Sequence, residues 1–148
     1  MQALYSTQAT ATGGRDGHVA TADGMLDLNV APPAELGGAG GATNPEQLFA
    51  AGYAACFHSA VQLIAQRRRV DAEGSSVTAE VGLGQGEDKN LDLQVSLDVA
   101  LPAASPEEAR DVVTRAHRVC PYSRGTRGNV DVRLLVDGSP LEPVAAEA

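Results

Sequence analysis

Two cysteines are the residues of this sequence whose type and setting could support redox chemistry. Cys56 lies inside a long apolar stretch, and Cys120 opens the run Cys120-Pro121-Tyr122-Ser123. A thiol peroxidase needs a thiolate that attacks a peroxide oxygen, a cation that holds this thiolate and the departing alkoxide, and a second thiol that resolves the sulfenic acid as a disulfide. The two cysteines could fill the two thiol roles.

The cation would have to come from a side chain. Cys56 lies too far along its expected helix for the helix dipole to lower its pKa much. Arginine suits the role better than lysine, because its planar guanidinium can serve a thiolate, a peroxide and a carboxylate at once. Arg15 lies in a glycine-framed turn, and Glu46 lies in the first turn of the same expected helix as Cys56. Both also have ordinary interpretations, as a hairpin turn and as a carboxylate that complements the helix dipole.

Other interpretations of the cysteines compete with this one. Cys56 and His58, with His117 and Cys120, supply the ligand types of a zinc site. Positions 56 and 58 lie about 200° apart around a helix, however, so they face opposite sides and we expect no metal site. A Cys–His hydrolase lacks any local signature here and usually has its thiol at a helix N-terminus. Two buried thiols that pack as small hydrophobes are a further interpretation, and for Cys56 taken alone the periodicity favours it.

Alternating apolar and polar residues predict the strands that must position these groups. Leu91–Leu101 alternates most clearly, and Val77–Leu83 shows the same pattern. The polar stretch Gly84–Asn90 joins the two, so we expect an antiparallel hairpin. Further strands are expected at Val130–Val136, at Leu26–Val30 and, more weakly, at Tyr5–Thr12.

Two helices have clear start signals. Asn44-Pro45-Glu46-Gln47 offers an N-cap, a proline at the first helical position and Gln47 at the capping-box position, and this helix should reach about Arg69. The same start signals occur in Ser105-Pro106-Glu107-Glu108. The helix that begins there should reach about Val119, because Pro121 stops it. These elements predict one α+β domain over residues 1–148.

The first helix also predicts an assembly. It is apolar on every side from Leu48 to Phe57, and such a helix must be covered all round. One small sheet covers one face, so we expect a homodimer in which two such helices meet. The 18 residues Leu48–Ala65 carry no formal charge, a length at which a membrane span is considered, but their Ala, Gly, Ser and Gln content favours a buried helix of a soluble protein.

Two remaining segments carry little chemistry. Gly37–Thr43 is rich in glycine and is expected to be a flexible connector, since no Gly-Lys-Ser/Thr follows to make it a phosphate loop. The tail from Gly138 onward is rich in Pro, Ala and Glu and is expected to be an arm or frayed.

The composition excludes several classes of function. The 148 residues carry 11 Lys and Arg against 19 Asp and Glu, a formal net charge of −8, and 3% aromatic residues. Such a chain lacks the positive field and the stacking surfaces that nucleic acid needs, and its charge disfavours anionic lipid. Residues 1–13 lack the basic and apolar regions of a secretory signal, so we expect the cytoplasm, where cysteines are more often catalytic or redox-active than structural.

Several motifs together resemble one protein family. They are the turn Gly13-Gly14-Arg15-Asp16-Gly17, the segment Thr43–Phe57 with its run Glu-Gln-Leu-Phe-Ala-Ala-Gly-Tyr, and Cys120-Pro121-Tyr122-Ser123 with Thr126–Val130. In order and spacing they resemble the organic hydroperoxide resistance protein family, one branch of a group shared with the osmotically induced OsmC proteins. The resemblance spans nearly the whole chain. The only local departure is His58-Ser59, where apolar or small residues are expected.

The resemblance implies a fold and a mechanism. It implies the OsmC-like fold as an intertwined homodimer, with long central helices, outer sheets and active sites at the subunit interface. Cys56 would be the peroxidatic cysteine, Cys120 the resolving one, Arg15 the activating cation, and Glu46 the carboxylate that orients Arg15. Organic hydroperoxides, lipid-derived ones included, would be the substrates, and dihydrolipoyl groups on proteins would recycle the disulfide. No metal, haem, flavin or other cofactor is implied.

A disulfide between positions 56 and 120 requires Cα atoms within about 4.4–6.8 Å of each other, at least transiently. Apolar side chains should line the substrate pocket, and the candidates are Phe49, Tyr53, Phe57, Met25 and Tyr122. Two alternatives stay open: a non-catalytic thiol redox sensor or binding module, and a peroxidase of the sibling OsmC type. Turnover with a dithiol donor separates the first from an enzyme, and preference between hydrogen peroxide and organic peroxides separates the second.

Overall fold

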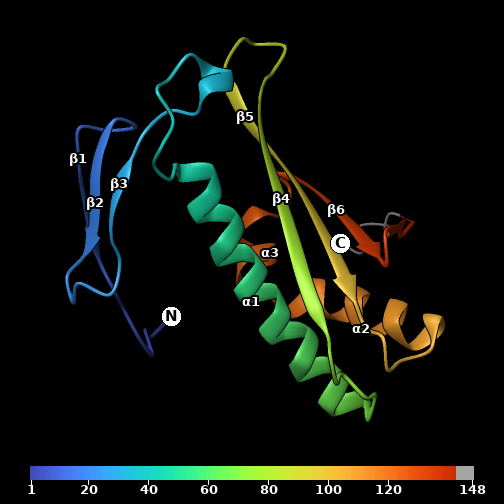
Figure 1. The fold of residues 1–148 in the computed structure, drawn as a ribbon. Coiled ribbons are helices and arrows are strands. Elements are labelled where there is room, and N and C mark those ends of the chain that lie inside the picture. The colour runs from blue at the N-terminus through green and yellow to red at the C-terminus, as the bar shows by residue number, and fades with distance from the viewer. Residues whose placement is uncertain (143–148) are drawn as a thin grey trace. The chain divides into compact units, whose positions relative to one another are not determined.

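The computed structural model describes residues 1–142, which belong to two compact units (Figure 1). Residues 1–48 make up the first unit, and the second begins at Phe49. Two sheets and a long helix dominate the chain, which confirms the predicted α+β class. The prediction of a single domain over the whole chain stays a prediction.

The first unit contains a three-stranded antiparallel sheet in the order β1-β2-β3. Its strands are β1 (Ala9–Thr12), β2 (Gly17–Thr21) and β3 (Asp27–Val30). The sequence predicted β3 and, as a longer strand, β1. It missed β2, because only two of its five residues, Val19 and Ala20, are apolar and they are adjacent, so no alternation is visible.

The glycine-framed turn joins β1 to β2 as a hairpin. The backbone N–H of Asp16 donates to the carbonyl of Gly13 at 3.2 Å, and Gly13 and Gly14 have positive φ angles of 76° and 61°. A side chain at Gly17 would collide with the carbonyl oxygen of Thr12. The turn therefore needs its glycines, and it presents Arg15 at its tip.

The connector to the long helix makes backbone hydrogen bonds that the sequence did not predict. After the short helix η1 (Ala34–Leu36), the backbone N–H groups of Gly38 and Gly40 donate to the carbonyls of Pro33 and Pro32, at 3.0 and 3.1 Å. Val30 and Thr43 form an isolated parallel bridge. These backbone bonds fold the start of the segment back on itself, and the flexibility of the connector stays a prediction.

The long helix α1 (Pro45–Arg68) begins as predicted. The side-chain oxygen of Asn44 accepts a hydrogen bond from the backbone N–H of Gln47 at 2.9 Å, so Asn44 is the N-cap. The Gln47 side chain accepts from the Thr43 hydroxyl at 2.9 Å, and not from the cap residue that a capping box would require. Within residues 1–142, α1 is the one helix long and apolar enough to cross a membrane, a test that the core helix of a soluble protein also passes.

The second unit is built on a four-stranded sheet in the order β4-β5-β6-β7. The expected hairpin is present as β4 (Ser76–Gln85) and β5 (Leu91–Ala100), which pair antiparallel over their full length. The strand β6 (Asp131–Val136) pairs parallel with β5. A parallel pair needs a crossover connection, and two helices supply it.

These helices are α2 (Pro106–Val119) and α3 (Pro121–Thr126). Ser105 caps α2 with the predicted reciprocal capping box, in which its side chain accepts from the Glu108 backbone and the Glu108 side chain accepts from the Ser105 N–H. Pro121 ends α2 as predicted, but it also starts α3, which the sequence analysis missed. Proline fits the first position of a helix as well as it stops the previous one.

The C-terminal segment was in part wrongly predicted. Residues Ser139–Pro140 form β7, which pairs antiparallel with β6, so this part is neither an arm nor frayed. The cause is a two-residue return through Asp137 and Gly138, both at positive φ. The rest of the predicted tail, residues 143–148, lies outside the described residues.

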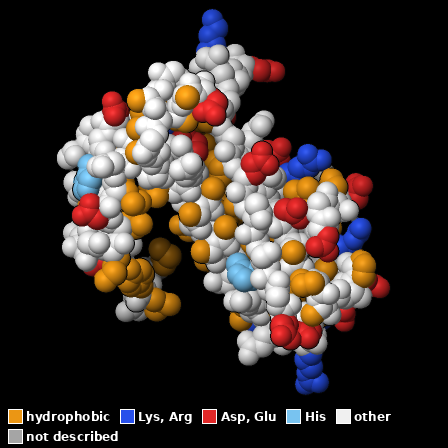
Figure 2. Space-filling model, in the orientation of Figure 1, with side chains coloured by type: hydrophobic (Ala, Val, Ile, Leu, Met, Phe, Trp, Pro, Cys, Tyr) orange, Lys and Arg blue, Asp and Glu red, His pale blue; other side chains and the backbone are white. Residues whose placement is uncertain are grey.

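One face of α1 is buried in the core of the second unit, together with β5 and α2. The fully or nearly buried members of this core include Val61, Ile64, Ala65, Val95, Leu97, Val99, Val112, Val113 and Ala116. Elsewhere on α1, the side chains of Ala51, Ala55 and Leu63 are exposed, and hydrophobic side chains follow this helix on the face seen in Figure 2. The apolar surface left exposed is the kind that the predicted homodimer would cover.

Candidate active site

The two cysteines meet inside the second unit. Cys56 lies on α1, and Cys120 is the single residue between α2 and α3. The Cys120 thiol donates to the Cys56 sulfur at an Sγ–Sγ distance of 3.6 Å, and both are free thiols. A disulfide bond is about 2.05 Å long, so an approach of about 1.5 Å would close it. Cys120 is fully buried and Cys56 is half-buried, so Cys56 is the more accessible sulfur.

The surroundings of Cys56 in this unit oppose its ionisation. Burial is the largest effect and raises the pKa of the Cys56 thiol, because the thiolate loses hydration. A hydrogen bond from the backbone N–H of Tyr122 acts against it and lowers the pKa, while the neighbouring Cys120 raises it further. The net result is a pKa above the ordinary value. An attacking thiolate at this position therefore needs a further positive charge.

The segment that carries Cys120 docks on α1 through a ladder of three contacts. The two sulfurs form the first contact. The Tyr122 ring lies against Gly52, where an added Cβ would come within 3.1 Å of the phenol oxygen and 3.3 Å of ring atom Cε2. The Ser123 hydroxyl shares a hydrogen bond with the Tyr53 hydroxyl at 2.9 Å, and both residues are fully buried. Glycine at position 52 is what allows the Tyr122 ring to approach the helix so closely.

Sequence reasoning missed the roles of Gly52 and Ser123. The Tyr53 hydroxyl also contacts the Thr126 hydroxyl at 3.3 Å, and burial raises the Tyr53 pKa. Two features of the sequence could have indicated these roles: a glycine inside an apolar helix, and a serine three residues after Cys120. A helical glycine is costly unless something must approach closely, and a serine at that spacing lies on the same side of a helix as position 120.

Four of the five predicted pocket residues form one aromatic cluster. Tyr53 is at its centre, with ring centroids 5.9 Å from Phe49, 6.5 Å from Phe57 and 5.6 Å from Tyr122. Tyr53 and Phe57 are fully buried and belong to the core, whereas Tyr122 is 42% exposed and Phe49 is half-buried. The accessible apolar surface of this cluster is therefore that of Phe49 and Tyr122.

The predicted residues of the first unit form an ion pair. Arg15 donates to the two carboxylate oxygens of Glu46 at 2.9 and 2.7 Å, a two-point arrangement that fixes the plane of the guanidinium. The hydrogen bond from Arg15 lowers the pKa of Glu46, so this carboxyl stays ionised, and the same bond raises the pKa of Arg15. Met25, the fifth predicted pocket residue, lies between β2 and β3 and is 85% exposed.

The histidines considered for a zinc site have other surroundings. His58 Nε2 shares a hydrogen bond of 3.0 Å with the Ser75 hydroxyl. Burial lowers the pKa of His117, and the positive charge of Arg127 lowers it further. Within residues 1–142, the buried Nδ1 of His117 has no hydrogen-bond partner. Among the described residues, no group of three or more His, Cys, Asp or Glu side chains is placed to hold a metal ion.

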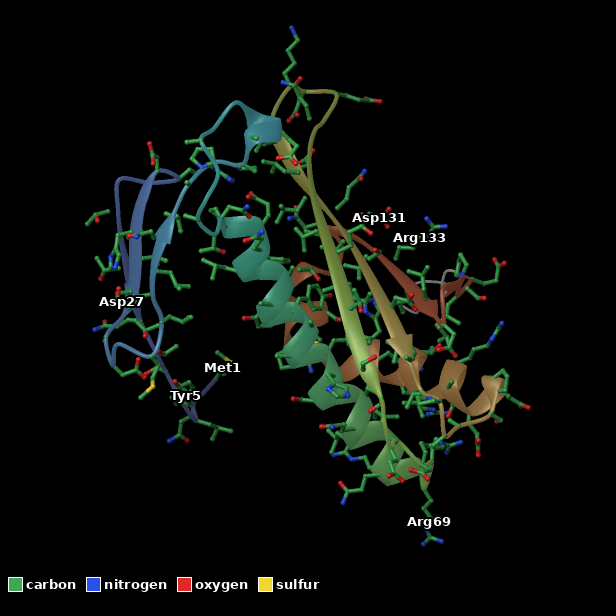
Figure 3. All side chains as sticks on the ribbon, viewed as in Figure 1. Met1, Tyr5, Asp27, Arg69, Asp131 and Arg133 are labelled. Carbon is green, nitrogen blue, oxygen red and sulfur yellow. The ribbon has the colours of Figure 1, made fainter. Side chains whose placement is uncertain are left out.

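A groove of about 600 Å³ runs along β6 and β7. Its lining includes His117, Asp131, Arg133 and Leu141, but neither cysteine. Figure 3 labels Asp131 and Arg133 on β6. This groove is therefore not the predicted substrate pocket.

Comparisons with known proteins bear on both the fold and the site. Residues 38–135 match the model of the family described as OsmC-like protein. The organic hydroperoxide resistance protein of Xanthomonas axonopodis pv. citri (strain 306) is 47% identical over 135 residues, which cover 90% of this chain and 94% of that protein.

Solved structures agree. The crystal structure of an organic hydroperoxide resistance protein from Legionella pneumophila is similar with a TM-score of 0.87 at 53% identity, and the match covers 91% of this chain and 98% of that one. The organic hydroperoxide resistance protein OhrB of Bacillus subtilis gives a TM-score of 0.83 at 42% identity, covering 90% of this chain and 99% of that one. These likenesses confirm the expected OsmC-like fold.

Proposed function

The chain belongs to the organic hydroperoxide resistance protein family, a branch of the OsmC-like group, and from this premise we propose that Cys56 and Cys120 together reduce organic hydroperoxides to alcohols. Membership gives the coarser function, a peroxidase role in organic hydroperoxide resistance. The residue roles and the reductant below are the proposal.

In the first step, the Cys56 thiolate attacks the outer oxygen of ROOH. The O–O bond breaks, the alkoxide takes a proton and leaves as ROH, and Cys56 becomes a sulfenic acid. In the second step, the Cys120 sulfur attacks the Cys56 sulfur and expels the hydroxyl group, which leaves as water with the thiol proton. The products are the Cys56–Cys120 disulfide and water.

The observation that carries this proposal is the 3.6 Å separation of two free thiols of unequal exposure. The half-buried Cys56 can meet a peroxide from outside, whereas the fully buried Cys120 can meet only its neighbour. An attacking thiol and a resolving thiol need this asymmetry. Two thiols that merely pack as hydrophobes do not.

Arg15 is the proposed source of the positive charge that Cys56 requires. Burial raises the pKa of Cys56, so ionisation near neutral pH calls for a cation. The two-point bond from Arg15 to Glu46 supports a fixed guanidinium plane, and one edge of a guanidinium can bind a carboxylate while its remaining N–H groups serve a thiolate or a peroxide. Glu46 is thus the proposed positioning residue for Arg15.

An organic hydroperoxide suits this site better than hydrogen peroxide. The rings of Phe49 and Tyr122 lie 6.3 Å apart and are the accessible part of the aromatic cluster around Tyr53. Apolar surface next to the reacting sulfur favours a peroxide with an apolar R group. Phe49 and Tyr122 are the proposed direct substrate contacts, while the fully buried Tyr53 and Phe57 would support their rings from the core. Met25, which is exposed in the first unit, is the remaining proposed contact.

We further propose a dihydrolipoyl group on a partner protein as the reductant and a homodimer as the working assembly. A dithiol reduces a disulfide through a mixed disulfide that its second thiol then releases. The exposed apolar residues of α1 support a covering second copy. The proposed compartment is the cytoplasm, where thiols stay reduced between cycles.

The deciding experiment counts free thiols after reduced protein is mixed with cumene hydroperoxide. We expect two thiols to be lost per chain, and turnover to follow on adding dihydrolipoamide. Loss of fewer than two thiols, or peroxide consumption by a Cys56→Ser variant, contradicts the mechanism. If the protein oxidises but none of dihydrolipoamide, glutathione and thioredoxin supports turnover, it would instead be a redox sensor. Sedimentation of the reduced protein tests the dimer.

A further inference from the structure

Tyr53 and Ser123 form a buried hydroxyl pair that the two-cysteine mechanism does not use. Their oxygens lie 2.9 Å apart, and both side chains are fully buried. Such a pair satisfies its own polar atoms, which is reason enough for it to exist in a core. The position of the pair relative to the two sulfurs suggests a second role.

The pair repeats the spacing of the cysteines on both elements. Tyr53 and Cys56 are three residues apart on α1, and Cys120 and Ser123 are three residues apart at the start of α3. Residues at this spacing lie on the same side of a helix, one turn apart. The two elements are therefore joined at two adjacent points, 53 to 123 by hydroxyls and 56 to 120 by sulfurs.

The stretch between these two points is stiff. The carbonyl of Cys120 accepts from the backbone N–H of Arg124 at 2.9 Å, which closes the first turn of α3. The Thr126 hydroxyl donates to the carbonyl of Tyr122 at 3.0 Å and approaches that of Ser123 at 3.3 Å. A stiff turn held at Ser123 also holds Cys120, so the hydroxyl bond restricts where the Cys120 sulfur can be.

From this arrangement we propose that Tyr53 is a positioning residue for the resolution step, acting through Ser123. The inference rests on the proposed function, because it concerns the step in which Cys120 attacks the Cys56 sulfenic acid. The hydroxyl bond keeps the Cys120 sulfur within reach of the oxidised sulfur. Without it, Cys56–SOH lives longer and a second ROOH can oxidise it to the sulfinic acid, releasing ROH.

Tyr53→Phe and Ser123→Ala test the proposal. After rapid mixing with peroxide, loss of the second thiol is a phase whose rate does not depend on peroxide concentration, unlike the first phase. Because an intramolecular hydrogen bond contributes about 0.5–1.5 kcal/mol, we expect each variant to slow this second phase by about 2- to 13-fold. At excess peroxide, mass spectrometry should find more Cys56 sulfinic acid in both variants than in the wild type. Tyr5→Phe is the matched control, since Tyr5 is 80% exposed. Figure 3 labels Tyr5 in the segment before β1.

The double variant separates positioning from simple structural support. Tyr53→Phe leaves the buried Ser123 hydroxyl without its partner and should lower the melting temperature more than Ser123→Ala, after which the Tyr53 hydroxyl keeps its contact with Thr126. Removing both hydroxyls leaves neither one unpaired. We expect the double variant to regain thermal stability and still resolve slowly. If it regains both, or if the single variants resolve at the wild-type rate, the inference is wrong.

The double variant also carries the test should a single variant fail to fold. A wild-type chain that loses no second thiol would overturn the proposed function, and this inference with it. Wild-type resolution with unaffected variants would overturn this inference alone.

Discussion

Arg15 and Glu46, 31 residues apart in the sequence, are joined by two parallel hydrogen bonds of 2.9 and 2.7 Å. The carboxylate side of this pair is largely shielded, with 14% of the Glu46 side chain exposed, while 45% of the Arg15 side chain remains open. Glu46 is thus the shielded member of the pair, and Arg15 is the member with accessible surface. This geometry supports the proposed role of Arg15 as a cation that Glu46 holds in place.

Glu46→Gln should lower kcat/KM for cumene hydroperoxide. The amide has the shape of the carboxylate but loses its charge and one acceptor oxygen, so the two-point bond becomes a single weaker one. A hydrogen bond to a charged group contributes about 1.5–3 kcal/mol, and the exposure of Arg15 reduces this through solvent screening, so we expect a loss of about tenfold. Glu107→Gln, in the first turn of α2, is the control and should behave like the wild type.

Arg15→Met should shift the ionisation of Cys56 to higher pH. Removing the positive charge that we propose to serve Cys56 disfavours the thiolate, so the pKa of Cys56 should rise above its wild-type value, in the direction in which burial already drives it. The rate of alkylation by iodoacetamide as a function of pH measures this directly, because Cys120 is fully buried and only Cys56 is accessible. At neutral pH, each unit of increase in the pKa slows alkylation by about tenfold.

Arg67→Met, at the last turn of α1, is the control for this titration and should leave the midpoint in place. Identical midpoints in the wild type and in Arg15→Met would show that Arg15 does not act on Cys56.

Cys120→Ser should separate the two halves of the catalytic cycle. The variant retains Cys56 and should consume one equivalent of peroxide, but no disulfide can form within the chain. Intact-mass measurements should then find one added oxygen at Cys56, and two at excess peroxide, as the sulfenic acid becomes a sulfinic acid. Sustained turnover of this variant with dihydrolipoamide at the wild-type rate would mean that Cys120 is not the resolving cysteine.

Gly52→Ala sets two small effects against each other. Alanine is better than glycine in a helix interior by about 1 kcal/mol. The new Cβ would lie 3.1 Å from the Tyr122 phenol oxygen, so the ring must give way by a few tenths of an ångström. Because Tyr122 is 42% exposed, it has room to do so, and we expect the free energy of unfolding to rise by less than about 1 kcal/mol. Gly52→Val adds more bulk at the contact with Tyr122 and should lower the free energy of unfolding. Chemical denaturation measures both changes.

The sequence predicted the elements whose signals are local. Asn44 and Ser105 mark the starts of α1 and α2 because capping depends on residues within one turn. The β4–β5 hairpin follows from apolar alternation around a polar turn. Strand β2 and helix α3 were missed because each is short and stabilised by its neighbours, β2 by pairing on both edges and α3 by its contacts with α1.

The site divides in the same way. Cys56 and Cys120 could be singled out from residue type and motif, as could Arg15 and Glu46. The fully buried state of Tyr53 and Phe57 could not, because apolar residues around a helix look alike until their packing partners are known. The Tyr53–Ser123 bond spans 70 residues, and no spacing rule in the sequence predicts which hydroxyls meet over such a separation.

The tyrosines give the cysteine pair a built-in optical probe. The chain has no tryptophan and three tyrosines, and two of these, Tyr53 and Tyr122, lie beside the cysteines, while the third is exposed near the N-terminus. Phenol emission is therefore free of indole background, and we expect a movement that joins the sulfurs to disturb the Tyr122 ring, because the Tyr122 backbone N–H donates to Cys56. Unlabelled protein should report its own oxidation and recovery through ultraviolet fluorescence, in real time and on every turnover.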